Sequence, residues 1–163
     1  MKVADLMKRP VHTVTPDTGV AEAARVMSAK DVGCLPVMEN GRVIGMLTDR
    51  DLRKALGEGR DLSACRCADV MAINVVFAKE TESLKDAVRG MDGRAVHHLP
   101  VLGNEAALVG MLALSDLALH IMLSSRPGGP PDDGEGMGEM TPGIPTPTLA
   151  DEVMRLAARD AWR

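Results

Sequence analysis

The sequence predicts a mixed α/β (α+β) protein of two tandem β-α-β-β-α units, packed sheet to sheet with pseudo-two-fold symmetry. An internal repeat supports this prediction, because three short motifs return in the same order about 64 residues later. A unit of this length leaves one sheet face open, so two units are expected to bury their sheets against each other. The paired motifs are Asp5-Leu6-Met7 with Asp69-Val70-Met71, Leu35-Pro36-Val37 with Leu99-Pro100-Val101, and Gly45-Met46-Leu47 with Gly110-Met111-Leu112.

The repeat and the composition together divide the chain into four predicted segments. Residues 1–60 form the first unit and residues 61–124 form the second. Residues 125–147 are rich in proline and glycine, and they predict a flexible linker because they lack the apolar side chains that offset the cost of ordering. Residues 148–163 regain a helical pattern and predict a C-terminal helix.

Each unit begins with a short helix and an extended piece, followed by a longer amphipathic helix. In the first unit the helical start lies near Val3–Met7 and the extended piece at Val11–Val14. The longer helix follows Pro16, and Asp17 is expected to cap it, as Thr81 is in the second unit. Spacings of three and four residues predict the buried faces of these helices. The faces consist of Val20, Ala23, Ala24 and Met27 in the first unit and of Leu84, Ala87, Val88 and Met91 in the second.

A β-hairpin and a second helix complete each unit. Strands Leu35–Met38 and Val43–Leu47 flank Asn40-Gly41, a pair that tolerates the positive φ angles of a tight turn. The second helix is expected at about Asp49–Leu56, and in the second unit at about Ser115–Leu123. The second unit contains one extra residue, which is expected in its hairpin turn because loops tolerate insertions.

The end of the second hairpin strand carries residues with binding chemistry. Thr48 lies at the predicted strand-to-helix junction, and Asp51 follows three residues later. The N-terminus of a helix offers free N–H groups and a partial positive charge, which suit a phosphate group. The Thr48 hydroxyl can donate to a phosphate oxygen, and the Asp51 carboxylate can accept from the paired hydroxyls of a ribose. The alternative is that Thr48 or Asp49, together with Asp51, only caps the helix.

This motif resembles the signature of the cystathionine-β-synthase (CBS) domain family. The run from Gly41 to Asp51, preceded by Leu35-Pro36-Val37, matches a pattern of Gly, a hydrophobic residue, Thr or Ser, and Asp. The resemblance covers most of the chain and implies a domain pair that binds adenosyl ligands in two clefts between the repeats. The second unit has the same frame at Gly110, Met111, Leu112, Ala113 and Asp116.

By this resemblance, the first cleft combines the Thr/Asp motif of the first unit with the beginning of the second unit. Three valines would enclose an adenine ring and Asp51 would hold the ribose. His97, with His98, would face phosphate as a protonated imidazole, assisted by Arg50. The alternative for the two histidines is a partly exposed pair at the start of a strand. The implied residues are Met46, Thr48, Arg50, Asp51, Asn74, Val75, Val76, Val96, His97 and His98.

The second cleft departs from the family pattern and is predicted to be weak or empty. Ala113 stands where the hydroxyl belongs, and Gly33 stands where the first cleft has His97. Asp116 is retained, so the ribose contact is kept while phosphate recognition is impaired. Ser115 precedes Asp116 and is not expected to replace the missing hydroxyl. The implied residues are Pro10, Val11, His12, Val32, Gly33, Met111, Ala113 and Asp116.

Composition and charge oppose several other functions. The formal net charge is −4 and aromatic residues make up 1%, which disfavours nucleic-acid binding through phosphate contacts or base stacking. No apolar run approaches the ~20 residues of a membrane span, and the N-terminus lacks a signal-peptide pattern, so a cytoplasmic protein is expected. The spacing of Cys34, Cys65 and Cys67 matches no paired metal-ligand set, and no metal site is expected. The sequence contains no catalytic motif and predicts a protein that is not an enzyme.

The C-terminal helix has several open interpretations. Its apolar stripe consists of Leu149, Val153, Leu156 and Ala157, and Trp162 lies near its end. Such a helix could dock on a partner protein, on the chain's own surface or on a sister subunit, or it could have no docking role.

Two functions follow from these features. The first is a stand-alone sensor that requires no cofactor, binds AMP, ADP, ATP or S-adenosylmethionine between its repeats, and signals to an effector protein, through the C-terminal helix among other routes. The second is a ligand-independent scaffold, in which apolar residues of the second helices join two chains as a homodimer. These residues are Leu52, Leu56, Leu119 and Met122.

Overall fold

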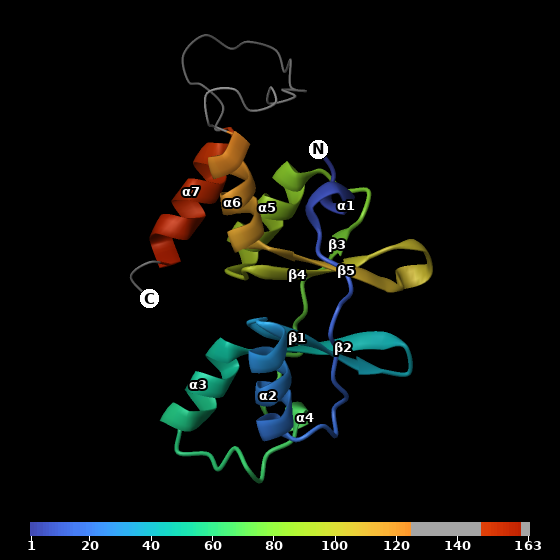
Figure 1. Ribbon diagram of the computed structural model, residues 1–163, viewed down its shortest axis with the longest axis vertical. Coiled ribbons are helices and arrows are strands. Elements are labelled where there is room, and N and C mark those ends of the chain that lie inside the picture. Colours follow the sequence, from blue (N-terminus) through green and yellow to red (C-terminus); the bar gives the residue numbers. More distant parts are fainter. Residues whose placement is uncertain (125–147, 161–163) are drawn as a thin grey trace.

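Two small sheets face each other at the centre of the molecule, and helices cover their outer faces (Figure 1). The computed structural model describes residues 1–124 and 148–160. The predicted linker, 125–147, and Trp162 lie outside the described residues. This arrangement confirms the mixed α/β fold with packed sheets that the repeat predicts.

The elements follow the repeat. The first half contains α1 (Val3–Leu6), α2 (Val20–Lys30), β1 (Cys34–Glu39), β2 (Arg42–Thr48) and α3 (Asp49–Gly57). The second half contains α4 (Cys67–Val70), β3 (Ala78–Lys79), α5 (Leu84–Arg94), β4 (His98–Leu102), the 3₁₀ turn η1 (Asn104–Ala106), β5 (Leu108–Ala113) and α6 (Leu114–Ser124). The C-terminal helix, α7, spans Leu149–Asp160.

Each half has an antiparallel hairpin at its centre. β1 pairs with β2 through a turn in which Asn40 and Gly41 have φ angles of 48° and 77°, as the sequence predicts. In the first half the third strand is reduced to one parallel bridge between Val14 and Val37. In the second half β3 pairs in parallel with β4, which pairs antiparallel with β5. The extra residue of the second half lies in its hairpin connection, where η1 forms.

The two short helices are exchanged between the halves. Val3 of α1 is fully buried in the core of the second half, and its N–H donates to the Glu82 carbonyl at 2.9 Å. In the same way, Cys67 of α4 is fully buried in the core of the first half, and its N–H donates to the Thr18 carbonyl at 2.8 Å. The predicted boundaries follow the sequence repeat and do not reveal this exchange, which ties the two cores together.

Two glycines allow the exchanged segments to approach the sheets. A Cβ added at Gly45 of β2 would overlap the sulfur of Met71, which follows α4. A Cβ added at Gly110 of β5 would overlap the sulfur of Met7, which follows α1. Glycine is therefore required by space at equivalent places of the two halves, which accounts for its recurrence in the repeat.

The capping residues proposed for the long helices were wrong. α2 begins after Gly19 without a side-chain cap, and Asp17 instead forms an ion pair with Arg66. α5 is capped by Ser83, whose hydroxyl accepts from the Asp86 N–H at 3.1 Å, and not by Thr81. The predicted buried faces of both helices are found, with Ala24 of α2 half-buried.

α7 packs on its own chain, against α5 and α6 of the second half (Figure 1). Val153 and Leu156 are buried in the second core, and Leu149 packs against it. Of the alternatives for this helix, docking on the chain's own surface is the one realised. Within the described residues, none of the helices combines the length and apolar character needed to cross a membrane.

Candidate functional site

Thr48 ends β2 and caps α3 through a reciprocal pair of hydrogen bonds with Asp51. The Thr48 N–H and hydroxyl donate to Asp51 Oδ2 at 2.9 and 2.7 Å, and the Asp51 N–H donates to Thr48 Oγ1 at 3.3 Å. Thr48 and Asp51 therefore cap α3, and their contact with a ligand stays a prediction. Among the described residues, the two hydrogen bonds from Thr48 to the Asp51 carboxylate both end on Oδ2, so Oδ1 keeps its capacity to accept.

The same arrangement recurs at the start of α7, so the geometry alone does not identify a ligand site. The Thr148 N–H and hydroxyl donate to Asp151 Oδ2 at 2.9 and 2.7 Å. Thr148 and Asp151 are exposed at the outer surface, whereas Thr48 and Asp51 are half-buried. The surroundings of Thr48 and Asp51, and not their mutual bonds, are what distinguishes them.

The chain that enters the second half passes along the end of β2. The Met46 N–H donates to the Ala72 carbonyl at 2.9 Å, and the Ala72 N–H donates to the Met46 carbonyl at 2.8 Å. Asn74, exposed, and Val75, half-buried, follow directly. This pairing brings the first half's Thr/Asp motif close to the first strand segment of the second half, as the resemblance implies.

The remaining valines of the predicted cleft belong to the second half. Val76 and Val96 are half-buried, and both pack against the second core. Their packing leaves part of each side chain accessible. The proposed contact of Val75, Val76 and Val96 with an adenine ring stays a prediction.

His97 and His98 lie at the start of β4, next to the beginning of α6. The His97 carbonyl accepts a hydrogen bond from the Leu114 N–H at 2.9 Å, which fixes the backbone of His97 to the first residue of α6. Both imidazoles are half-buried. Gly33 holds the equivalent place in the first half, where its carbonyl accepts from the Asp49 N–H at 3.0 Å.

The charges around His98 come from both halves of the molecule. Burial lowers the pKa of His98 and His97 lowers it further; Asp49 and Asp116 act in the opposite direction, and Arg50 also lowers it. These groups together hold the pKa of His98 below its ordinary value. The protonated imidazole expected beside a phosphate group stays a prediction. Because Asp49 and Arg50 belong to α3, the start of α3 and the start of β4 face each other across the two halves.

The second cleft is built by the same backbone pairing but contains an internal cation. The Lys8 N–H donates to the Met111 carbonyl at 2.8 Å, which repeats the pairing of Ala72 with Met46. Lys8 Nζ lies 2.6 Å from Asp116 Oδ1, and the Asp116 side chain is only 11% exposed. Ala113 provides no hydroxyl to occupy this carboxylate. Lys8 was missed by the sequence analysis, although the repeat aligns it with Ala72 and so marks the difference in charge.

The remaining residues of the predicted second cleft belong to the first half, and their contact with a ligand stays a prediction. Val32 packs against the first core, and His12 is half-buried. Pro10 and Val11 line a cavity of about 600 Å³ at the hairpin side of the molecule, together with residues of both hairpins and not with Asp116. The other lining residues are Arg9, Thr13, Met38, Gly41, Ala107, Leu108 and Val109.

A second cavity, of about 290 Å³, lies beside the two histidines. Its wall includes Ser115 of α6, a residue that was not predicted to lie beside the histidines. It also includes Ala157 of α7, whose position was not predicted. The lining residues are His97, His98, Leu114, Ser115, Ala118 and Ala157.

The ionisable side chains of the described residues do not suggest metal binding. Across residues 1–124 and 148–160, no group of three or more His, Cys, Asp or Glu side chains is placed to hold a metal ion. Burial, with a smaller contribution from Asp49, raises the pKa of Cys34 to about 12. The Cys34 thiol therefore stays protonated at neutral pH and acts as a small apolar core residue.

Comparison with known families identifies the repeat. The family model of the CBS domain matches residues 3–58 and 67–123, one match for each half. The chain belongs to the CBS-domain family. The exchange of α1 and α4 therefore occurs within a CBS pair.

Individual relatives resemble the whole CBS pair. The CBS domain-containing protein YhcV of Bacillus subtilis is 37% identical over 127 residues, which cover 77% of this chain and 89% of YhcV. A putative signal-transduction protein with CBS domains from Burkholderia ambifaria has the same fold, with a TM-score of 0.72 and 27% identity over 77% of this chain and 97% of that one. The fold also matches the CBS domain protein PAE2072 of Pyrobaculum aerophilum complexed with AMP, with a TM-score of 0.67 and 21% identity over 72% of this chain and 90% of that one.

Proposed function

We propose that this CBS pair is a stand-alone regulatory protein that binds an adenine nucleotide or adenosyl ligand between its halves and signals to an effector protein. The proposal depends mainly on one juxtaposition. Thr48 and Asp51 lie next to Met46, which pairs with Ala72 of the second half, and their neighbours Asp49 and Arg50 act on the pKa of His98 at the start of β4. A ribose acceptor, apolar side chains and polar groups near one another would suit an adenosyl ligand.

The relatives support the coarse part of this proposal. The matched region covers 89% of YhcV and 97% of the Burkholderia chain, which leaves little room in either for an attached enzyme domain. The Pyrobaculum protein shows that this fold can hold AMP, although its likeness to this chain is one of fold. The preference among AMP, ADP, ATP and S-adenosylmethionine depends on residues of this chain, and it can be measured by titration with each ligand.

Isothermal titration calorimetry with these four ligands tests the proposal. The wild type should bind at least one of them, and Asp51→Ala should abolish or strongly weaken that binding because the ribose loses its acceptor. Asp69→Ala is the matched control, since Asp69 accepts from the Arg66 N–H at the start of α4 at 2.8 Å but lies outside the proposed site. Absence of binding by the wild type, or equal binding by Asp51→Ala, would reject the proposal.

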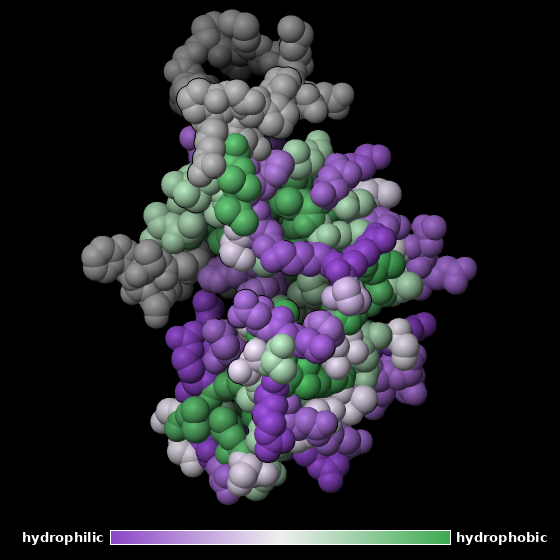
Figure 2. Space-filling model, in the orientation of Figure 1, coloured by the Kyte–Doolittle hydropathy of each residue, from purple (hydrophilic) through white to green (hydrophobic). Residues whose placement is uncertain are grey.

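A second function, assembly into a homodimer, is favoured by an apolar patch on α6. Leu119, Met122 and Leu123 are 56%, 65% and 50% exposed, and Figure 2 shows hydrophobic surface over this helix. Apolar surface of this kind is typical of protein contacts. Sedimentation velocity with wild type and Met122→Glu tests the idea. A wild type that stays monomeric at micromolar concentration would exclude the dimer.

A further inference from the structure

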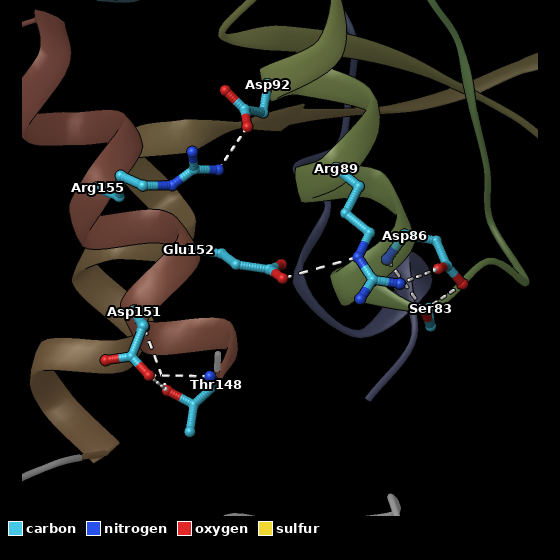
Figure 3. Close-up of polar contacts among 8 residues, drawn as sticks. All are labelled: Ser83, Asp86, Arg89, Asp92, Thr148, Asp151, Glu152 and Arg155. Carbon is cyan, nitrogen blue, oxygen red and sulfur yellow. Dashed lines mark hydrogen bonds and ion pairs between the residues drawn. The ribbon is translucent and has the colours of Figure 1, made fainter. Parts of the chain in front are cut away.

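α7 is held on the second half by a small number of specific contacts. Val153 and Leu156 are 0% and 1% exposed, so they supply most of the apolar contact. Two ion pairs flank them (Figure 3). The Arg155 guanidinium contacts Asp92 of α5, and Glu152 Oε1 lies 3.7 Å from Arg89 Nε, also on α5.

One of these contacts is incomplete. Among the described residues, Glu152 Oε2 is buried and has no hydrogen-bond partner. A buried acceptor without a partner costs free energy in the docked state. The buried Glu152 oxygen therefore offsets part of the free energy that Val153 and Leu156 contribute to docking of α7. A modest additional contact can then shift the equilibrium between docked and undocked α7.

The sequence of the second half, and not that of the first, suits this helix. Ala118 of α6 lines a cavity together with Ala157 of α7, so its small side chain lets the two helices approach. The repeat aligns Ala118 with Arg53 of α3, an exposed charged residue. It also aligns Asp92, the partner of Arg155, with Ser28. The position of α7 on the second half is therefore specific.

α7 forms one wall of the cavity beside the histidines. Five of the six lining residues belong to β4, α6 and the residue preceding β4, and the sixth is Ala157. In Figure 1 the C-terminal end of α7 lies near the level of β4, at the side where α3 and α6 begin. If α7 leaves its docked position, this cavity loses its outer wall.

We propose that ligand binding and docking of α7 stabilise each other, because α7 supplies a wall of the cavity beside His97 and His98, two residues of the proposed ligand site. The inference rests on the proposed function and names its regulation. A ligand that extends from the cleft past His97 and His98 contacts Ala157 only when α7 is docked. It therefore has a higher affinity for the docked state, which is the condition for coupling. The coupling is reciprocal, so undocking α7 weakens ligand binding by the same factor.

The effector would then recognise one state of α7. The undocked state exposes Val153 and Leu156 on one side of an amphipathic helix, a surface suited to a groove on another protein. Ligand binding buries this surface again and so prevents the effector from binding α7.

Two pairs of variants test the coupling in the full chain, with AMP, ADP, ATP and S-adenosylmethionine as probes. Ala157→Leu fills part of the cavity from α7, and Ala158→Leu places the same side chain at the neighbouring exposed position. Leu156→Asp undocks α7, and Met154→Asp places the same charge at a position that is 56% exposed. Circular dichroism checks that each variant is folded.

Ala157→Leu and Leu156→Asp should weaken binding of the best ligand about fivefold or more, while both controls bind as the wild type does. Hydrogen exchange of residues 149–158 should slow when that ligand is added to the wild type. If the wild type binds a ligand but Ala157→Leu matches Ala158→Leu and exchange is unchanged, the coupling is refuted and the proposed function stands. If the wild type binds none of the four ligands, both are refuted.

Discussion

Removal of the Thr48 hydroxyl separates the two roles that this side chain can have. Thr48→Ala deletes one hydrogen bond of 2.7 Å to Asp51 Oδ2 and one of 3.3 Å from the Asp51 N–H. α3 has nine residues and buries only Ala55 fully, so it depends on its cap more than a well-packed helix does. Loss of a cap of this kind costs about 1 kcal/mol, since values span roughly 0.5–2 kcal/mol and one of these two bonds is long.

Urea unfolding and thermal unfolding measure this cost. We expect a loss of about 1 kcal/mol in the free energy of unfolding, which corresponds to about 2–4 °C in Tm. Ala113→Thr is the reciprocal change, because Ala113 holds the equivalent place before α6 and leaves Asp116 without a hydroxyl partner. It should stabilise the protein by a similar or smaller amount, since Asp116 must then give up part of its contact with Lys8.

Calorimetry on the same variants addresses the ligand. If the hydroxyl also contacts phosphate, Thr48→Ala should weaken binding of a nucleotide more than it weakens binding of adenosine, which has no phosphate. Unchanged stability of Thr48→Ala would show that the hydrogen bonds between Thr48 and Asp51 do not stabilise α3. Lower stability with equal loss for both ligands, or with no loss for either, would show that Thr48 is a cap and does not bind phosphate.

Three further changes test the geometry. Lys8→Ala frees the Asp116 carboxylate, so a second and weaker nucleotide-binding event should appear in calorimetry; an unchanged single event would refute competition by Lys8. Because the pKa of His98 is lowered in the folded protein, the unfolded chain binds more protons below about pH 6.5. The free energy of unfolding should therefore fall as the pH is lowered from 7.5 to 5.5. His98→Gln should reduce that fall, as measured by urea unfolding. Gly45→Ala should lower the free energy of unfolding by about 1–3 kcal/mol, because its methyl group overlaps a methionine sulfur. Gly57→Ala, with open space around it, should be neutral. Equal stabilities of the two variants would contradict the close approach at Gly45.

The sequence was sufficient to predict most elements because their signals are local. The Asn40-Gly41 turn and the apolar spacing of both long helices each depend on a few neighbouring residues. The predictions of the capping residues were wrong because the signal for a cap is also local. Several residues with capping side chains precede each helix, and the sequence does not say which of them ends in the extended conformation that a cap requires. Ser83, two residues after Thr81, is the one that caps α5.

The exchange of α1 and α4 could not be predicted from the repeat. Each short helix has nearly the same sequence, so either arrangement places equivalent residues in equivalent cores. The site was partly predictable for a related reason. The Thr48–Asp51 motif is local, whereas the ion pair of Lys8 with Asp116 and the approach of Ala157 to the histidines join residues far apart in the chain.

The exchanged helices bear on how a ligand signal can leave the cleft. Turning one half against the other together with its own short helix would break the paired backbone bonds of Lys8 with Met111 and of Met46 with Ala72, and it would withdraw Val3 from the opposite core. Release of α7 withdraws two buried side chains and two ion pairs from the second half alone. Local opening follows the path of fewest buried contacts. We therefore expect α7 to respond to the ligand at a lower free-energy cost than a rotation that reverses the exchange of α1 and α4.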